Sequence, residues 1–189
     1  MKKIAIFASG NGSNTENIIK YFSIRNKIKI ELILSNNPTA KVLTKAKKHG
    51  ISTMIFSKRD LIEGLVLSIL KSKEINFIVL AGFLLKIPKS IIDNYDHKII
   101  NIHPSLLPLY GGKGMYGLHV HQKVFESKDR QTGITIHFVN QSYDKGDIIF
   151  QAKCMLSKRM KPKEIQKKVH SLEMKFLPRI IENILDGDY

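Results

Sequence analysis

The sequence predicts an α/β fold, a mainly parallel, twisted sheet with helices on both faces and a Rossmann-like N-terminal half. Strand-like and helix-like patterns alternate from the first residues, which is the rhythm of βαβ units. The strand-like segments are largely apolar runs, as in parallel strands that are buried on both faces. A glycine-containing turn joins the first strand to the first helix, and such turns open the nucleotide-binding halves of these folds.

The first half of the chain holds most of this alternation. Strands are expected over residues 3–8, 28–34, 52–56, 77–81 and 98–102. Helices are expected over residues 13–22, 39–49 and 61–71. The second of these helices stops at Gly50, and Gly64 weakens the third.

The second half changes character. Residues 111–117 hold four glycines in seven positions and are expected to form a loop. Two strand-like runs, 132–139 and 147–156, are joined by a polar segment. A long helical pattern covers residues 162–185, with an interruption or kink expected near Pro178 because proline removes a helical hydrogen bond.

The composition is that of an ordinary globular protein. The chain has 189 residues, 43% of them hydrophobic and 25% charged, which suits one domain over residues 1–189 with a single core. Its one cysteine, Cys154, favours a reducing compartment. The apolar stretch near Met1 is too short for a secretory signal, and no run approaches the roughly 20 apolar residues that span a bilayer. A cytoplasmic protein with no membrane partner is therefore expected.

The formal net charge of +15 is the unusual number. It is compatible with an anionic partner such as nucleic acid, a membrane surface or a phosphorylated substrate. The basic residues are spread along the chain, however, and there is no tryptophan to stack on bases. We therefore prefer a solvated basic surface that attracts small anions, and expect no nucleic-acid partner.

The turn after the first strand, SGNGSN over residues 9–14, has features of a phosphate site. Glycines let the backbone approach an anion, and a helix N-terminus offers N–H groups and a positive dipole. A dinucleotide site is disfavoured because Thr15 replaces the third glycine and no acidic residue ends the second strand. The turn favours a small phosphate ester over NAD. The alternative is a purely structural helix cap by Ser13 or Asn14.

The stretch NIHPSLLP over residues 101–108 is the most informative. It lies just beyond the C-terminal end of a strand, where open α/β sheets place their ligands. Asn101 and His103 alternate along an extended backbone, so both side chains point to one face. An amide donor and an imidazole on one face suit acyl transfer, in which one stabilises an oxyanion and the other moves protons. A lone histidine is more often structural, but the loop position and the neighbouring Asn101 favour function.

Taken together, these segments resemble one enzyme family. Residues 101–108 resemble the signature of enzymes that use 10-formyltetrahydrofolate. With the phosphate turn, LAGF at residues 80–83, GITIHFV at 133–139, Asp144 and residues 151–152, the chain is similar to the phosphoribosylglycinamide formyltransferase family. The matches fall in order and span nearly the whole chain, so the set is far more specific than any one motif.

The resemblance implies a reaction and a catalytic trio. The formyl group of the co-substrate 10-formyltetrahydrofolate would pass to the amine of phosphoribosylglycinamide, a step of de novo purine (IMP) synthesis. By motif match, the catalytic residues are Asn101, His103 and Asp144. Asn101 and a protonated His103 would stabilise the oxyanion, and Asp144 would raise the pKa of the imidazole and keep it cationic near neutrality. Without the family, Asp144 would be interpreted as a turn carboxylate.

The resemblance also implies binding residues. Gly12, Ser13 and Asn14 match the phosphate-binding loop, and Glu173 matches the residue that holds the glycinamide portion. The positions that match folate contacts are Arg59, Leu84, Leu85, Ile87, Asn101, Asn140, Gln141, Ser142, Tyr143 and Asp144. The plain alternatives are a solvated helix carboxylate at Glu173 and ordinary core at residues 83–85, although an apolar wall there suits a flat pterin ring.

One segment departs from the family. Between Pro108 and His121 the family often has a short Pro-Gly turn, whereas this chain carries the glycine-rich residues 111–117. This loop is either a mobile lid or an inert insertion. No carboxylate or thiolate joins His119, His121 and His137 in the pattern, so no catalytic metal is expected.

Four alternatives remain beside this interpretation. Methionyl-tRNA formyltransferase would need a further C-terminal domain for tRNA, which we do not expect because the sequence is that of one domain. Formyltetrahydrofolate hydrolase would need a further N-terminal domain, which we do not expect because the first strand already begins at Lys3. A basic nucleic-acid-binding module predicts salt-sensitive affinity that does not depend on Asn101 or His103. The degenerate glycine turn disfavours an NAD-dependent oxidoreductase. The expected partners are small-molecule substrates, and the expected state is a monomer or homodimer.

Overall fold

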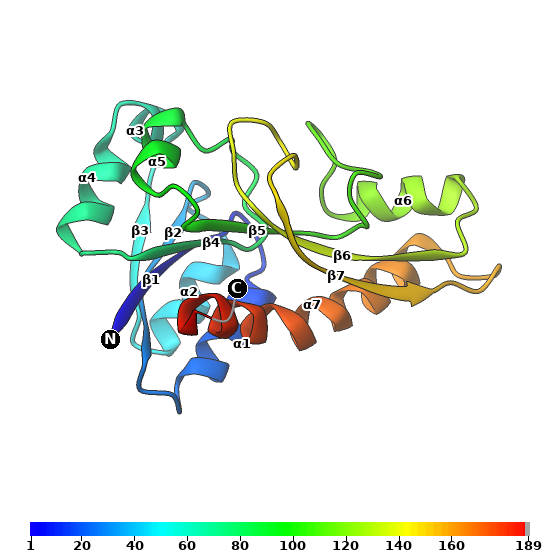
Figure 1. Ribbon diagram of the computed structural model, residues 1–189, viewed down its shortest axis with the longest axis horizontal. Helices are drawn as coiled ribbons and strands as arrows, with labels where there is room; N and C mark the ends of the chain where they lie inside the picture. The colour runs from blue at the N-terminus through cyan, green and yellow to red at the C-terminus, as the bar shows by residue number, and fades with distance from the viewer. Residues whose placement is uncertain (188–189) are drawn as a thin grey trace. The chain divides into compact units, whose positions relative to one another are not determined.

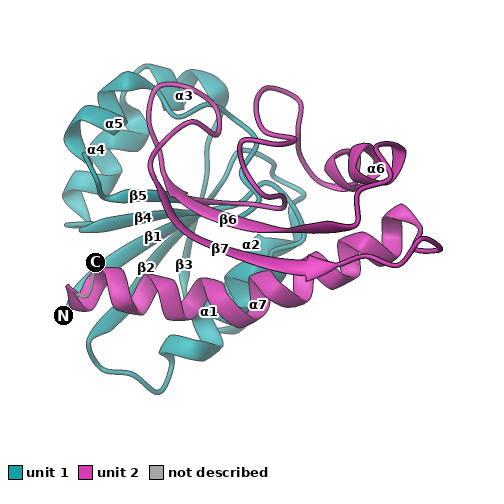
Figure 2. Cartoon of the chain, turned by 45° about the vertical axis from the view of Figure 1, so that its right-hand side comes forward, with its two compact units in different colours: residues 1–100 teal, residues 101–189 magenta. Residues whose placement is uncertain are grey.

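The chain forms two compact units in the computed structural model, which describes residues 1–187. One unit covers residues 1–100 and the other starts at Asn101 (Figure 2). The strand β5 (Ile99–His103) crosses this boundary and carries two of the predicted catalytic residues into the second unit. The predicted α/β class is confirmed, while the single domain over residues 1–189 stays a prediction.

The first unit is built on parallel strands. These are β1 (Lys2–Phe7), β2 (Ile28–Ser35), β3 (Ser52–Ile55) and β4 (Phe77–Leu80). β1 pairs with β2 on one side and β4 on the other, and β2 pairs with β3, always in parallel. All of β4 and the last four residues of β1 are buried, which explains their continuous apolar sequence.

Helices cover both faces of these strands. α1 (Ser13–Phe22) and α2 (Lys41–Lys48) lie on one face, and α3 (Lys58–Ile62), α4 (Leu65–Ser72) and α5 (Lys89–Asn94) lie on the other (Figure 1). The helix predicted over residues 61–71 is two helices, because Gly64 between them has a left-handed φ of +94°. The six-residue α5 was not predicted, since it is too short to show a clear period.

The second unit pairs two antiparallel strands with two helices. β6 (Gln131–Phe138) and β7 (Ile148–Met155) match the predicted runs, and α6 (Leu118–Glu126) is a helix that the sequence analysis did not name. α7 (Pro162–Asp186) packs against both strands and α6. Within residues 1–187, no helix combines the length and the apolarity needed to cross a bilayer.

The interruption expected near Pro178 is not found. α7 runs for 25 residues through this proline. Leu177, Pro178, Ile180 and Ile181 are all buried, so tertiary packing of this face outweighs the helical hydrogen bond that the proline removes.

The turn between β1 and α1 is held against α2. Gly12 takes a left-handed φ of +70° just before α1, and its carbonyl accepts the first helical hydrogen bond from the N–H of Glu16 at 2.9 Å. The N–H of Val42 in α2 donates to the carbonyl of Gly10 at 3.2 Å. A Cβ on Gly12 would lie 2.5 Å from Cγ2 of Val42, so this position needs glycine both for its φ and for the contact.

Gly12→Ala should therefore cost more stability than Gly50→Ala. Both glycines are left-handed, with φ of +70° and +69°, but nothing lies within 4 Å of a Cβ on Gly50. Backbone strain alone predicts a loss of about 1 kcal/mol for Gly50→Ala. The contact with Val42 predicts a further loss of roughly 1–3 kcal/mol for Gly12→Ala. Urea unfolding of both variants measures the difference, and equal losses would refute the packing argument.

Candidate active site

In the first unit, Ser9 ties together loops that follow three parallel strands. Its hydroxyl donates to Oδ1 of Asn36 at 2.6 Å and accepts from the N–H of Leu84 at 3.1 Å. Its carbonyl accepts from Nδ2 of Asn37 at 3.3 Å. Ser9 is 7% exposed, so this hydrogen-bond network is fixed within the fold. Ligands bind at these carboxyl ends of strands in open α/β sheets.

The residues predicted to bind phosphate lie at the start of α1, beside this hydrogen-bond network. Gly12, Ser13 and Asn14 are half-buried. The N-cap residue of α1 is Gly12, not Ser13 or Asn14, and it makes no side-chain cap bond. Uncapped amides at a helix N-terminus are suited to an anion.

An acidic residue near this turn has its charge compensated. Glu16 pairs with Lys45 at 3.0 Å and Lys20 at 3.1 Å. Hydrogen bonds from Lys45 and then Lys20 lower the pKa of Glu16 to about 2. The carboxylate therefore stays ionised but does not leave a net negative charge facing the turn.

Four predicted folate residues also belong to the first unit, in different environments. Arg59 lies on α3, where its exposed guanidinium pairs with Glu63 at 2.8 Å. Leu84 is 45% exposed and Leu85 is half-buried, so both offer apolar surface. Ile87 is buried in the core, so little of its side chain is open to a ligand.

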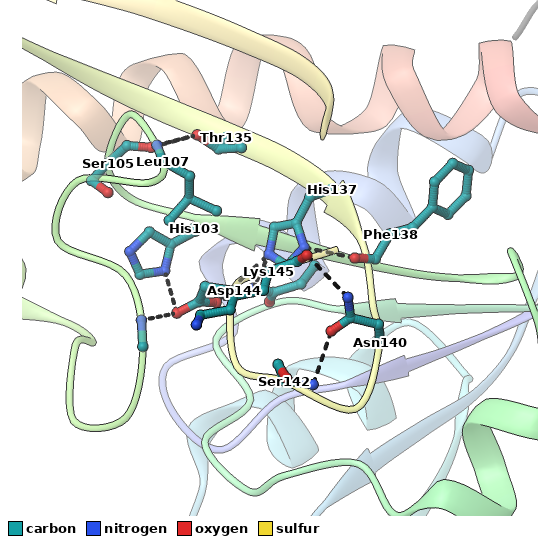
Figure 3. A network of polar contacts seen from close by, with 12 residues as sticks. His103, Ser105, Leu107, Thr135, His137, Phe138, Asn140, Ser142, Asp144 and Lys145 are labelled. Atoms are coloured by element: carbon teal, nitrogen blue, oxygen red, sulfur yellow. Dashed lines mark hydrogen bonds and ion pairs between the residues drawn. The ribbon is translucent and has the colours of Figure 1, made fainter. Parts of the chain in front are cut away.

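The predicted catalytic residues come together in the second unit. Asn101 and His103 stand on β5, and Asp144 stands on the loop between β6 and β7. Nδ2 of Asn101 donates to Oδ1 of Asp144 at 3.3 Å, and Nδ1 of His103 lies 3.5 Å from Oδ2 of the same carboxylate. Figure 3 shows the imidazole and the carboxylate facing each other. Residues about 40 positions apart thus converge on one carboxylate.

The two ring nitrogens of His103 have different environments. Nε2 lies 2.7 Å from the carbonyl of Tyr110, which can only accept, so Nε2 carries a proton. Nδ1 faces Asp144 at 3.5 Å, beyond a good hydrogen bond. Nε2 is therefore anchored, and Nδ1 is the nitrogen that is available for chemistry.

The cationic state that was expected of His103 is wrong, because the ring is buried. The side chain is 4% exposed, and burial lowers its pKa below the ordinary value. Asp144 opposes this most strongly, Tyr110 and Glu173 also raise the pKa, and His137 lowers it further. The net shift is downward, so His103 is neutral near pH 7 in this unliganded arrangement, not cationic as the sequence predicted.

Asp144 is held as a carboxylate by its neighbours. Its φ of +53° is left-handed, which aspartate tolerates at a cost. The N–H of Gly112 donates to its Oδ2 at 2.8 Å. Burial alone would raise its pKa, but His137, His103 and this N–H outweigh it, and the pKa lies below the usual value. The buried group therefore keeps its negative charge.

His137 is a site residue that was not predicted as one, although it lies in the GITIHFV segment at 133–139. It is 2% exposed, and its Nδ1 donates to the carbonyl of Phe138 at 2.7 Å. Nε2 then accepts from Nδ2 of Asn101 at 3.1 Å and lies 3.6 Å from Oδ1 of Asp144. His137 alternates with Thr135 along β6, which was the available signal that it shares a face with a buried polar side chain.

The loop that carries Asp144 is shaped by Asn140 and Gly146. Nδ2 of Asn140 donates to the carbonyl of Lys145 at 3.0 Å, and its Oδ1 accepts from the N–H of Ser142 at 2.9 Å. A Cβ on Gly146 would collide with the carbonyl of Phe138. Asn140 thus uses its side chain inside the loop (Figure 3). The exposed predicted folate residues of this loop are Asn140, Gln141, Ser142 and Tyr143.

A buried threonine fixes the segment after His103. Thr135 is fully buried; its hydroxyl donates to the carbonyl of Ser105 at 2.7 Å and accepts from the N–H of Leu107 at 2.9 Å. Nε2 of Gln151 donates to the same hydroxyl at 2.9 Å and to the carbonyl of Leu107 at 3.0 Å. The turn of the NIHPSLLP segment is thereby bonded to β6 and β7.

Glu173 is not the solvated helix carboxylate of the plain alternative. Its side chain is 13% exposed and lies 2.8 Å from Nδ1 of His170. Its charge raises the pKa of both His103 and His121, which places it within electrostatic range of the predicted catalytic histidine, His103. Among residues 1–187, no group of three or more His, Cys, Asp or Glu side chains is arranged to hold a metal ion.

The first residues of the glycine-rich segment 111–117 contact the site, so this part of the segment is not an inert insertion. Gly112 donates to Asp144, and a Cβ on Gly111 would lie 2.5 Å from Cδ2 of Leu107 and 3.3 Å from Cβ of Asp144. The first residues of this loop are therefore part of the catalytic arrangement. Whether its later residues close over a ligand stays a hypothesis.

The chain is similar in sequence and in structure to known enzymes. A sequence profile described as "Formyl transferase" matches residues 2–181. The phosphoribosylglycinamide formyltransferase of Bacillus subtilis is 34% identical, over 98% of this chain and 95% of its own length. The crystal structure of the same enzyme from Bacillus halodurans has a TM-score of 0.89 at 30% identity, covering 100% of this chain and 97% of that one.

Plant relatives are longer than this chain. The chloroplastic phosphoribosylglycinamide formyltransferase of Arabidopsis thaliana is 35% identical over 98% of this chain, which spans 66% of the plant protein. The chain spans 50% of the chloroplastic relative from Vigna unguiculata. The match to the bacterial relative therefore gives the fuller comparison.

Thr135→Val should destabilise the fold. Valine keeps the shape but leaves the N–H of Leu107 buried without its acceptor, at an expected cost of about 2–3 kcal/mol. Urea unfolding measures this cost, with Thr132→Val as the matched control, since that buried threonine of β6 lies outside the network. If both variants lose the same stability, the network does not hold the segment.

His121 should make the protein acid-labile. Burial lowers its pKa from 6.5 to about 4, so the unfolded chain binds a proton before the folded chain does. The stabilisation is complete above pH 6.5 and is lost as the pH falls toward 4, by about 3 kcal/mol from this group. His121→Leu should flatten that part of the curve of unfolding free energy against pH. His119→Leu, at an exposed position of α6, is the control, and an unchanged curve for His121→Leu would contradict this.

Proposed function

The chain belongs to the formyl transferase family, and from this premise we propose that it transfers the formyl group of 10-formyltetrahydrofolate to the amine of phosphoribosylglycinamide. The products are formylglycinamide ribonucleotide and tetrahydrofolate, within de novo purine synthesis. The family predicted from the ordered motifs is confirmed by the profile and by relatives matched over nearly their full length.

One observation carries the proposal: an anchored imidazole and a carboxamide meet on one buried carboxylate. Nδ2 of Asn101 lies 3.3 Å from Oδ1 of Asp144 and Nδ1 of His103 lies 3.5 Å from its Oδ2, and burial shields the imidazole and the carboxylate from water. Acyl transfer needs a proton acceptor and donors for a developing oxyanion. No nucleophilic side chain is required, because the substrate amine attacks.

His103 moves the proton in this scheme. The amine attacks the formyl carbon, a C–N bond forms, and the electron pair of the C=O bond moves onto oxygen. Neutral His103 has its free lone pair on Nδ1, so this nitrogen takes the proton that the amine releases. When the bond between the formyl carbon and N10 of the folate breaks, the same proton goes to N10, and the imidazole is neutral again.

Asp144 stabilises the transient cation. Its carboxylate stays ionised and lies 3.5 Å from Nδ1 of His103. The attraction is weak while the imidazole is neutral and strengthens once it is protonated, so it acts on the intermediate more than on the bound substrates. Protonated His103 and an N–H of Asn101 are then donors for the oxyanion. Asn101 has to exchange its bond to His137 or Asp144 for that role.

Binding roles follow the family pattern. We propose that Gly12, Ser13 and Asn14 hold the phosphate through the N-terminus of α1, and that Glu173 holds the glycinamide portion. The residues that we propose to contact the folate are Asn101, Asp144, Arg59, Leu84, Leu85, Ile87, Asn140, Gln141, Ser142 and Tyr143. Of these, Ile87 offers little side-chain surface, and Asn140 uses its side chain within its loop.

Wider properties also stay proposals. The profile covers most of both units, which supports a single formyltransferase domain. A cytoplasmic location and the absence of a nucleic-acid partner are proposed from the composition and the charge pattern. Small-molecule substrates and a catalytic cycle without a metal are proposed from the family. A monomer or a homodimer is expected from the sequence.

The decisive assay mixes the protein with phosphoribosylglycinamide and 10-formyltetrahydrofolate and follows formylated product and released tetrahydrofolate. Formation of product that depends on both substrates supports the proposal. Tetrahydrofolate released without the amine would instead indicate the hydrolase. A folded protein that turns over neither way would reject both.

Substitutions at the trio should slow the chemical step and leave the fold intact. His103→Ala and Asp144→Asn should each lower kcat by about 10²- to 10³-fold, because each removes a group that acts on the charge formed in the reaction. Steady-state kinetics with circular dichroism on the same samples measure this. Near-normal kcat in folded His103→Ala would remove its assigned role.

A further inference from the structure

Tyr110 contacts the catalytic histidine with its backbone and a distant carboxylate with its side chain. Its carbonyl lies 2.7 Å from Nε2 of His103, and its phenol donates to Oδ2 of Asp129 at 2.8 Å. The residue therefore connects the proton-carrying nitrogen of His103 to the segment between α6 and β6.

The backbone of Tyr110 is not in a conformation that it would choose by itself. Its φ is +55°, and a left-handed backbone costs a non-glycine residue roughly 1–2 kcal/mol. The residue before it is held, because the hydroxyl of Ser105 donates to the carbonyl of Leu109 at 2.6 Å. The direction of the Tyr110 carbonyl is thus imposed by contacts on both sides, of which the phenol bond is one.

Within residues 1–187, the phenol bonds to Asp129 and makes no hydrogen bond to His103 or Asp144. A hollow of about 340 Å³ is lined by Tyr110, Asp129 and Met155 among others, and its lining includes neither His103 nor Asp144. Removing the hydroxyl therefore does not touch the groups that act on the substrates. Any effect on the reaction has to pass through the backbone of Tyr110.

We propose, on the basis of the formyl transfer proposed above, that Tyr110 is a positioning residue that selects the reactive nitrogen of His103. The phenol bond to Asp129 fixes the carbonyl, and the carbonyl keeps the proton of neutral His103 on Nε2. Nδ1 is then left with its lone pair toward Asp144 and the reacting atoms. Without the hydrogen bond from the phenol to Asp129, which we call the tether, the carbonyl moves and the proton is shared between Nε2 and Nδ1 of His103.

The phenol is suited to act as the donor of this tether. Burial raises its pKa, Ser127 opposes this, and Asp129 raises it further, so the net pKa lies above the ordinary value. The hydroxyl stays protonated at the pH at which a neutral His103 works.

Tyr110→Phe tests the proposal with two measurements on the intact protein. ¹⁵N NMR of the histidine rings, above the pKa of His103, should show Nε2–H alone in the wild type and a mixture with Nδ1–H in the variant. Loss of one hydrogen bond predicts a kcat lower by about five- to tenfold, with KM for both substrates unchanged. Tyr21→Phe on α1 is the matched control, because phenylalanine keeps the stacking of that ring with Arg25.

A second pair of variants tests the other end of the tether. Asp129→Asn keeps an oxygen that accepts the phenol hydrogen and should behave as the wild type. Asp129→Ala removes it and should reproduce the NMR mixture and the lower kcat. This pair gives an answer even if Tyr110→Phe does not fold.

The outcomes separate this proposal from the proposed function. Retention of pure Nε2–H with unchanged kcat in Tyr110→Phe, or equal behaviour of Asp129→Asn and Asp129→Ala, would overturn the positioning role. Absence of formyl transfer in the wild type would reject the function alone, since the NMR comparison needs no substrate.

Discussion

Asp144 places an ionised carboxylate, 11% exposed, within 3.6 Å of two imidazoles and one carboxamide. A buried charge is costly unless it is paired and hydrogen-bonded. The surrounding structure meets this demand: Gly112 supplies an N–H, and Gly146 lets the loop turn back against β6. The same contacts that keep the charge stable also aim it at Nδ1 of His103. Stability of the site and its chemistry therefore depend on one interaction.

The proton on His103 follows from a balance that the sequence does not display. Proximity to Asp144 argues for a cation, but burial of the ring is the larger effect and the net pKa falls. In the proposed reaction a neutral imidazole is the better proton acceptor, and it becomes a cation beside the carboxylate only while the reaction proceeds. The anchored Nε2 leaves Nδ1 as the nitrogen that we propose takes part. A low pKa and a nearby carboxylate are thus complementary features of one proton carrier.

Much of the fold and the trio was predictable because the signals are local. Apolar runs marked β1, β2 and β4, and the alternation of Asn101 with His103 put both on one face. Other features depend on tertiary contacts. Pro178 lies inside a continuous helix because its neighbours are buried. The contributions of Gly112 and Tyr110 come from backbone groups, which any residue possesses, so the side-chain sequence cannot reveal them.

The most direct measurement is an NMR titration of the ring nitrogens of His103 in the wild-type protein, first free and then with phosphoribosylglycinamide and an unreactive folate analogue. We expect a neutral, Nε2-protonated ring near pH 7 in the free protein, with a pKa below the ordinary value of 6.5. Replacing Asp144 by asparagine should lower this pKa further. A ring that is already cationic at pH 7 without ligands would rule out His103 as the proton acceptor.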